Sequence, residues 1–396
     1  MDKMTVRDID VRNKRVLVRV DFNVPVDLRT GAITDDSRIR AALPTIAYLR
    51  ERHARVVLMS HMGRPKGKVV EDLRLAPAAK RLSELLGRPV KALHECIGPE
   101  VEKSVAAMRP GDVVLLENLR FHAEEEQGDE GFARALASLG DVYVDDAFGT
   151  AHRAHASIAG IAKFLPAVAG FLLEKEINTL GGLVEDPAHP FTAILGGAKV
   201  SDKVALINNM MGKVDALLIG GGMAATFLKA RGVNVGSSSV ETDLVATADG
   251  LMKKAAAHDV AILLPTDVVV APEIDFNAKA TEVAVDNIPA DQKIADIGPA
   301  TTAAFTQQLK ASRTVFWNGP MGVVEMPQFA GGTKALANLL TTLDATTVVG
   351  GGSTAETMDT LGLSDKVTFV STGGGASMEF LGGEALPGVT ALLDRK

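Results

Sequence analysis

The stretch Val348–Glu356, VVGGGSTAE, contains the unit from which the fold is built. It ends an apolar run, continues with three glycines and two hydroxyl side chains, and then begins a segment of helical character. Three adjacent glycines cost backbone entropy and pack no side chain, so this position requires bare backbone. The order of strand, glycine turn and helix start is typical of a parallel α/β sheet, with the turn at the carboxyl end of the strand.

The same unit recurs along the chain. Short runs rich in Val, Ile and Leu alternate with amphipathic segments such as APAAKRLSELLG (76–87). Continuous apolar strands that alternate with helices predict an α/β fold with parallel sheets covered on both faces. The predicted strands are 16–20, 56–60, 113–117, 142–146, 192–196, 216–220, 261–265, 314–318, 346–350 and 367–371.

Length and composition indicate a globular protein with more than one domain. The chain has 396 residues, 46% of them hydrophobic and 23% charged, and a length of this order predicts two or three domains. The net charge of −7 argues against a general nucleic-acid partner. The single cysteine, Cys96, cannot form an internal disulfide, so we expect a buried or inert thiol in a reducing compartment. No signal peptide or apolar run of about 20 residues is visible, so we expect a cytoplasmic protein without a membrane partner.

Arginine is distributed unevenly. Of the 21 arginines, 18 precede residue 185, and arginine suits the bidentate binding of carboxylate and phosphate. The segment 171–190 looks like a helix that ends in glycines before a proline-containing turn. We therefore expect an N-terminal domain (1–170), a linking helix (171–184) and a C-terminal domain (185–380). The acidic segment AEEEQGDE (123–130) is interpreted as a solvated loop.

The residues that follow the predicted strands differ between the halves. In open parallel sheets, ligands bind beyond the carboxyl ends of the strands. Six strand ends in the second half are glycine-rich and lead into helices. A single glycine cluster is explained by tight packing between a helix and a strand. Six clusters favour instead a cradle of backbone N–H groups that binds a polyphosphate such as a nucleotide. In the first half the strand ends predict a pocket for a small anion that carries phosphate and carboxylate. Its candidate cations are Arg19, Arg38, Arg64, Arg120, Arg153, His61, His152 and His155.

Several familiar signatures are absent from the sequence. It lacks GxxxxGK[ST], the HRD and DFG set, HExxH and any Cys/His grouping with zinc spacing, which argues against a P-loop enzyme, a protein kinase and a catalytic zinc. No GxGxxG follows the first strand. Two alternatives remain open: an NAD-dependent dehydrogenase, suggested only by the glycine-ended strands, and a non-catalytic nucleotide-binding protein.

Seven motifs cover nearly the whole chain: RVDFNVP (19–25), SHMGRP (60–65), ENLRFH (117–122), DAFGTAHRAHAS (146–157), GGAKVSDK (196–203), WNGPMGVVE (317–325) and STGGGAS (371–377). Together and in this order they resemble the phosphoglycerate kinase family. The resemblance implies reversible, Mg²⁺-assisted phosphoryl transfer between ATP/ADP and 3-phosphoglycerate/1,3-bisphosphoglycerate in glycolysis. It also implies a monomer of two Rossmann-like three-layer α/β/α domains with mainly parallel sheets. A linking helix and hinge would allow closure for in-line transfer, and the C-terminal tail (381–396) would pack on the N-terminal domain.

The resemblance also assigns site residues. Arg38 joins substrate binding to catalysis, Lys199 assists the transferred group, and Lys203 binds ATP. Gly352 and Gly374 belong to the amide-rich loops that neutralise the transferred phosphoryl group. The phosphoglycerate contacts are Asp21, Asn23, Arg38, His61, Arg64, Arg120 and Arg153. The nucleotide contacts are Lys203, Gly298, Glu325, Gly351, Gly352, Ser353 and Thr354.

One position departs from the family pattern. The family's phosphate loop usually reads GGGD, and its aspartate helps to hold Mg²⁺, whereas this chain has Ser353. A hydroxyl is a weaker ligand for a hard cation than a carboxylate, so we expect phosphate oxygens and water to hold most of the metal. The attacking carboxylate, with a pKa of about 3.5, is already ionised at neutral pH and requires no general base.

Overall fold

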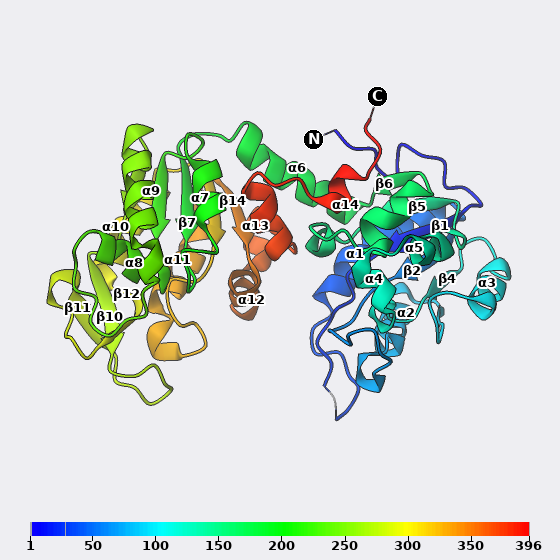
Figure 1. Ribbon diagram of the computed structural model, residues 1–396, viewed down its shortest axis with the longest axis horizontal. Coiled ribbons are helices and arrows are strands. Elements are labelled where there is room, and N and C mark those ends of the chain that lie inside the picture. The colour runs from blue at the N-terminus through cyan, green and yellow to red at the C-terminus, as the bar shows by residue number, and fades with distance from the viewer. Residues whose placement is uncertain (1, 28, 396) are drawn as a thin grey trace. The chain divides into compact units, whose positions relative to one another are not determined.

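The computed structural model describes residues 2–27 and 29–395. The chain divides into two compact units (Figure 1). Unit 1 extends to Asn178 and also contains the C-terminal segment from Ala385, and unit 2 consists of Thr179–Glu384.

Unit 1 is built on a six-stranded parallel sheet with the order β3-β4-β2-β1-β5-β6. Its central strands are buried on both faces because helices cover the sheet, which accounts for their continuous apolar sequences. The strands are β1 (Arg15–Arg19), β2 (Arg55–Met59), β3 (Val90–Ala92), β4 (Val113–Leu115), β5 (Val142–Asp145) and β6 (Ala167–Ala169). The helices are α1 (Ser37–Glu51), α2 (Ala76–Leu86), α3 (Pro99–Ala106), α4 (Ala123–Gln127), α5 (Glu130–Ala137) and α14 (Pro387–Thr390).

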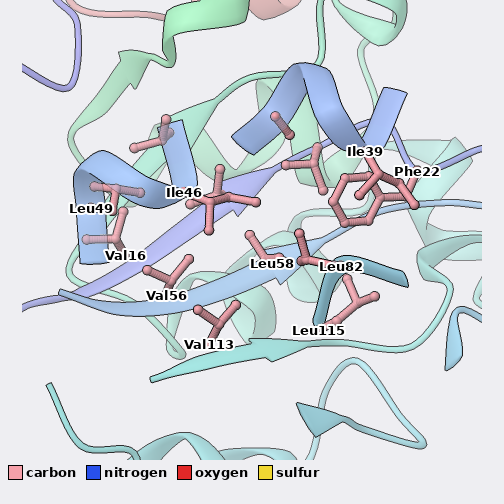
Figure 2. Packing of buried hydrophobic residues seen from close by; sticks show 14 of the residues in the cluster. Val16, Phe22, Ile39, Ile46, Leu49, Val56, Leu58, Leu82, Val113 and Leu115 are labelled. Atoms are coloured by element: carbon pink, nitrogen blue, oxygen red, sulfur yellow. The ribbon is translucent and has the colours of Figure 1, made fainter. Parts of the chain in front are cut away.

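One face of this sheet packs against α1 and α2 (Figure 2). Ile39, Ile46 and Leu49 project from one face of α1 onto the strands, where side chains such as Val56 and Leu58 meet them. Residues three or four apart share one face of a helix, so this spacing buries a continuous apolar stripe. The contact fixes the start of α1, where Arg38 lies, relative to the carboxyl ends of β1 and β2.

Unit 2 contains two sheets. The larger is six-stranded and parallel, with the order β15-β14-β13-β7-β8-β9. The smaller is three-stranded and antiparallel, with the order β11-β10-β12. The strands are β7 (Phe191–Leu195), β8 (Ala216–Ile219), β9 (Ala261–Leu263), β10 (Asp267–Ala271), β11 (Thr281–Ala284), β12 (Lys293–Ile297), β13 (Thr314–Asn318), β14 (Thr346–Gly350) and β15 (Phe369–Val370). The helices are α7 (Val204–Met210), α8 (Met223–Ala230), α9 (Val245–Ala257), α10 (Pro299–Lys310), α11 (Gly331–Leu340), α12 (Gly352–Thr360) and α13 (Gly375–Leu381).

The predicted α/β class with mainly parallel sheets is confirmed, and each of the ten predicted runs overlaps a strand. The antiparallel sheet was not predicted. Its edge strand β11 is largely exposed and has no apolar run, so the sequence carries little signal for it. The edge strands β3 and β6 were also not predicted; their sequences, VKA and AVA, contain no run of large apolar residues.

The interpretation of 123–130 as a solvated loop is wrong. The segment forms α4 and the first residue of α5, and the side chain of Glu125 is fully buried. The helix predicted at 171–184 is α6 (Phe171–Glu185), which continues through Gly181 and Gly182 instead of ending at them. Residues of α6 up to Asn178 belong to unit 1, and those from Thr179 belong to unit 2.

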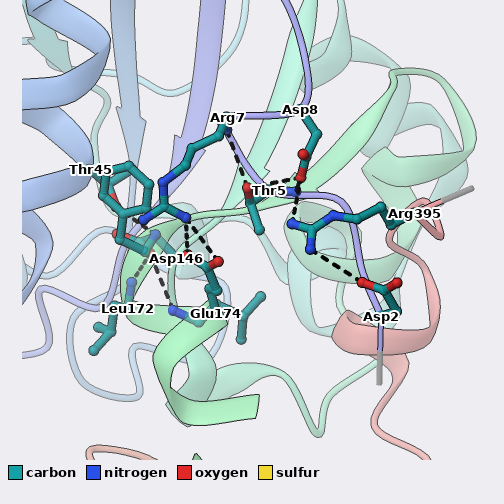
Figure 3. A network of polar contacts seen from close by, with 11 residues as sticks. Asp2, Thr5, Arg7, Asp8, Thr45, Asp146, Leu172, Glu174 and Arg395 are labelled. Carbon is teal, nitrogen blue, oxygen red and sulfur yellow. Dashed lines mark hydrogen bonds and ion pairs between the residues drawn. The ribbon is translucent and has the colours of Figure 1, made fainter. Parts of the chain in front are cut away.

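The start of α6 is held by side chains of unit 1 (Figure 3). Asp146, which follows β5, accepts hydrogen bonds at Oδ1 from the backbone N–H groups of Leu172 (2.9 Å) and Leu173 (3.3 Å). Thr45 Oγ1 accepts one from the N–H of Phe171 at 2.9 Å. These contacts satisfy N–H groups that have no partner inside the helix. A Cβ at Gly170 would lie 2.1 Å from Asp146 Oδ1, so only glycine allows the carboxylate this close.

The two ends of the described chain meet in unit 1. The N–H of Met4 donates to the carbonyl of Leu393 at 2.8 Å. Arg395 binds the Asp8 carboxylate at 2.8 Å and thereby holds the pKa of Asp8 below its ordinary value (Figure 3). The C-terminal segment is therefore an integral part of unit 1. Within residues 2–27 and 29–395, none of the helices combines the length and the apolar character needed to cross a bilayer.

Candidate active site

In unit 1, the loops after β1 and β2 meet the start of α1. Arg38 Nη1 donates to Asp21 Oδ2 at 2.6 Å, and both side chains are partly exposed. Asn23 Oδ1 accepts a hydrogen bond from the N–H of Gly63 at 2.9 Å. Three residues predicted as phosphoglycerate contacts are therefore fixed at one edge of the sheet, together with the loop that carries Arg64.

Behind this edge, a buried arginine orients His61. Arg19 is fully buried, and its Nη2 lies 3.0 Å from Nδ1 of His61, which is 4% exposed. A guanidinium only donates hydrogen bonds, so Nδ1 must accept, and the proton of the neutral ring is on Nε2. Burial, followed by the charges of Arg19 and Arg120, holds the pKa of His61 well below its usual range. His61 therefore presents a neutral N–H donor, as a contact to an anion requires.

Arg19 is itself held by a buried serine and a buried glutamate. Its Nε donates to Ser157 Oγ at 3.1 Å, and that hydroxyl donates to Glu125 Oε1 at 2.6 Å. The N–H of Ser157 donates to Glu125 Oε2 at 2.9 Å. Burial raises the pKa of Glu125, and the nearby charge of Arg19 opposes this shift. We call Glu125, Ser157, Arg19 and His61 the buried relay. Nothing in the sequence distinguishes Glu125, because it is one of three consecutive glutamates.

Further cations surround the relay. Arg120 is buried, donates to the carbonyl of Gly63 at 2.9 Å, and has its pKa lowered chiefly by burial. Burial and then the charges of Arg120, Arg153 and Arg19 together lower the pKa of His155 to about 4. Arg153 is exposed. These mutual effects show that the cations lie close enough to create a strongly positive region, which favours an anion.

In unit 2, part of the glycine pattern serves packing between loops. A Cβ at Gly196 would lie 2.2 Å from the carbonyl oxygen of Pro320, and a Cβ at Gly319 would lie 2.3 Å from that of Gly196. A Cβ at Gly221 would lie 2.5 Å from the nitrogen of Gly197. The loops after β7, β8 and β13 thus pack backbone against backbone. The interpretation of all six glycine clusters as a ligand cradle is too broad, because these glycines have a structural reason.

Two other glycines are open. Gly352 begins α12 and Gly374 precedes α13, and within the described part of the chain no atom lies within 4 Å of a Cβ built on either. Gly351, which caps α12 with a φ of 92°, lies against the Asn318 side chain. Helix starts present N–H groups and positive potential, so an accessible start such as that of α12 favours phosphate.

Lys203 lies at the start of α7, next to the end of β13. Its Nζ donates to Asn318 Oδ1 and lies 3.7 Å from the sulfur of Met378, and burial lowers its pKa to about 8. The Asn318 Nδ2 group is buried and has no hydrogen-bond partner among residues 2–27 and 29–395. Lys199 is exposed on the loop after β7. The strand ends therefore offer two ammonium groups and one unpaired amide donor.

A cavity of about 290 Å³ lies beside α12, and Glu325 and Ser353 both line it. Lys334 and Glu356 line the same cavity and were not predicted. Glu356 follows Ser353 by three residues on α12, and this helical spacing is the signal that could have identified it. Both Ser353 and Glu356 are exposed oxygen donors, the ligand type that Mg²⁺ takes.

Two predicted nucleotide contacts have structural roles. Thr354 is fully buried, and its hydroxyl accepts a hydrogen bond from the N–H of Gly319 at 2.8 Å. Gly298 precedes α10, and a Cβ there would lie 2.3 Å from the carboxylate of Asp267. That carboxylate accepts hydrogen bonds from the first turn of α10, including the N–H of Thr301 at 2.7 Å.

The model of the family described as phosphoglycerate kinase matches residues 6–384. The chain belongs to the phosphoglycerate kinase family. Among similar proteins, phosphoglycerate kinase of Moorella thermoacetica is 58% identical and that of Pelotomaculum thermopropionicum is 56% identical, each over 395 residues that cover 100% of both chains.

Solved structures of the family share the fold. The chain matches phosphoglycerate kinase from Coxiella burnetii with a TM-score of 0.88 and 41% identity, and that from Pyrococcus horikoshii OT3 with a TM-score of 0.86 and 34% identity. Each match covers 98% of both chains. The two-domain α/β fold that the phosphoglycerate kinase resemblance implied is thereby confirmed.

Proposed function

We propose that the chain catalyses reversible, Mg²⁺-assisted phosphoryl transfer between ATP and 3-phosphoglycerate, which yields ADP and 1,3-bisphosphoglycerate, as a step of glycolysis. Membership of the phosphoglycerate kinase family makes it a phosphotransferase with a carboxyl group as acceptor, so the dehydrogenase alternative is wrong. The observation that carries the proposal is the concentration of cations around a neutral His61 donor in unit 1.

In unit 1, the cationic region binds a substrate with two anionic groups. Arg64, Arg120 and Arg153 neutralise phosphate, and His61 donates through Nε2. Arg38 is held by Asp21 at the same edge and approaches the carboxylate that attacks. That carboxylate is already ionised, so no residue acts as a general base, and the side chains contribute charge and orientation.

In unit 2, the nucleotide phosphates lie at the start of α12. The N–H groups at Gly351 and Gly352 bind phosphate oxygens, and Lys203 leaves part of its contact with Asn318 to do so. Lys199 and the backbone at Gly374 face the transferred phosphoryl group, while Glu325 binds the ribose. Mg²⁺, when bound, would neutralise charge on the phosphates. Ser353 would be the protein group that holds it, and phosphate oxygens and water would supply the remaining ligands.

The two substrates are assigned to different units. In-line transfer requires the attacking and leaving oxygens to lie on opposite sides of one phosphorus atom. We propose that the units close on each other during the reaction, with α6 and the loop at 373–375 as hinges, and that closure excludes water as a competing acceptor. The single cysteine supports a reducing, cytoplasmic location, and we propose a monomer.

The decisive assay measures ADP formation from ATP and 3-phosphoglycerate, with hydroxylamine present to trap the acyl phosphate as a hydroxamate. We expect equal amounts of ADP and hydroxamate, and no product after EDTA removes the metal. Glycerate without its phosphate is the matched control and should react far more slowly. ADP formation without hydroxamate would contradict the proposal, and nucleotide binding without any turnover would favour the non-catalytic alternative.

A further inference from the structure

A second group of potential metal ligands lies outside the site described above. Glu95 and Cys96 follow β3, and His122 follows the short helix Leu119–Phe121. One carboxylate oxygen of Glu95, the sulfur of Cys96 and a ring nitrogen of His122 all lie within 4.8 Å of one another. His122 Nε2 lies 2.8 Å from Glu95 Oε1. No local spacing in the sequence indicates this group, because His122 lies 26 positions after Cys96.

The donor set indicates the class of cation. A thiolate, an imidazole and a carboxylate together suit a borderline-soft divalent ion such as Zn²⁺ better than Mg²⁺ or Ca²⁺. Zinc bonds of about 2.0–2.3 Å in a tetrahedral site place ligand atoms roughly 3.3–3.7 Å apart. The distances between the three ligand atoms would therefore change by up to about 1.5 Å on binding.

The site is accessible and partly pre-organised. The side chain of Glu95 is 50% exposed and that of His122 is 27% exposed, whereas Cys96 is fully buried beneath them. The Glu95 carboxylate is also held in place, because its Oε1 accepts a hydrogen bond from the N–H of Cys96 at 2.7 Å. The ring of His122 lies against Phe132, with 5.2 Å between ring centroids, which limits its rotation.

We propose that Glu95, Cys96 and His122 bind one zinc-class divalent cation, with water as the fourth ligand. Binding forms a bond from the cation to the Cys96 sulfur and releases the thiol proton to solvent. It also replaces the hydrogen bond that His122 Nε2 donates to Glu95 Oε1, and the proton of the neutral ring moves, through solvent, from Nε2 to Nδ1 so that Nε2 can coordinate. This cation is separate from the metal that accompanies the nucleotide, and the inference does not depend on the proposed reaction.

Binding here would tie two strand-end loops together. The loop after β3 already contacts the loop after β4, because the N–H of Glu117 donates to the carbonyl of Glu95 at 3.3 Å. Asn118, in the second loop, binds the carbonyls of Met62 and Leu73. The cation would add a cross-link between these loops, so we expect it to stabilise unit 1 against unfolding.

Cobalt is the probe for the test, because a thiolate bound to Co²⁺ gives a sulfur-to-metal charge-transfer band in the near ultraviolet. The full chain, freed of metal with a chelator, is titrated with Co²⁺ and then with Zn²⁺. We expect one ion per chain, the charge-transfer band, and its loss when Zn²⁺ displaces Co²⁺. The chain has one cysteine, so the band can arise only from Cys96.

Variants assign the ligands. Cys96→Ser should abolish the band, and His122→Gln and Glu95→Gln should each weaken binding at least ~10-fold. His94→Asn, at an exposed histidine of the same loop, is the matched control and should bind as the unchanged chain does. Thermal unfolding of each metal-free variant confirms folding, and if Cys96→Ser does not fold, the exposed Glu95→Gln carries the test. The inference would be overturned if the band were absent, or if Glu95→Gln and His122→Gln bound Co²⁺ with the affinity of the unchanged chain.

Discussion

At the scale of single residues, the proposed chemistry depends on Arg38 and Lys199 neutralising the transferred phosphoryl group. We expect Arg38→Ala and Lys199→Ala each to lower kcat at least ~10²-fold, the usual cost of losing one well-placed donor at such a site. Steady-state kinetics with saturating substrates measures the loss, and circular dichroism confirms folding. Arg40→Ala, two residues along α1 where the side chain binds Asp36, is the control and should retain near-normal kcat. Near-normal turnover of either test variant would exclude its role.

Glu125 supports the site from behind, through Ser157 and Arg19. Removal of the Glu125 carboxylate would leave the fully buried Arg19 without the negative charge that balances its own through Ser157. We expect Glu125→Ala to lower the free energy of unfolding by about 2–4 kcal/mol and to weaken phosphoglycerate binding, because His61 loses its fixed orientation. Urea unfolding and calorimetric titration measure the two effects. The adjacent Glu124→Ala, at an exposed position, should change neither; equal behaviour of the two variants would contradict the buried relay.

At the scale of elements, the start of α6 depends on a buried carboxyl group. Burial raises the pKa of Asp146 to about 7. Between about pH 4 and 7 the folded chain keeps the Asp146 proton, whereas the unfolded chain has released it. The free energy of unfolding therefore decreases as the pH rises through this range.

Asp146→Asn keeps the oxygen that accepts from Leu172 and Leu173 but removes the titration. We expect its urea midpoint to depend less on pH between 4 and 7 than that of the unchanged chain. The exposed Asp344→Asn is the control and should leave the pH profile of the midpoint unaltered. An unchanged profile in Asp146→Asn would show that this group does not titrate in that range.

The glycine loops of unit 2 separate packing from binding. Gly319 has a φ of 93° and no room for a Cβ, whereas the Cβ of a residue at 352 would meet no atom within 4 Å in the described structure. We expect Gly319→Ala to destabilise the chain by at least about 2 kcal/mol. Gly352→Ala should unfold normally but bind ATP more weakly, because its methyl group hinders access to the first N–H groups of α12. Thermal unfolding and nucleotide titration distinguish them, and normal ATP affinity in Gly352→Ala would remove that loop from the site.

At the scale of the whole molecule, the sequence predicted the repeated strand–helix units and drew attention to the residues that follow the strands. Strands buried on both faces must be apolar throughout, so the ten runs were visible, whereas the exposed β11 was not. A strand-end motif predicted His61 as a site residue, whereas the role of Arg38, at the start of α1, was implied by the family resemblance. Glu125 could not be identified, because only the packing of α4 against Ser157 distinguishes it from its neighbours. The Cys96–His122 contact likewise arises from the order of strands in the sheet, which no local spacing encodes.

The central claim is that one unit binds phosphoglycerate, the other binds the nucleotide, and transfer occurs when the units close. Small-angle X-ray scattering tests it in four states: free, with 3-phosphoglycerate, with MgADP, and with both. We predict a radius of gyration that decreases clearly only when both ligands are present. Superimposable profiles in all four states, from a preparation that is active and saturated, would contradict the account.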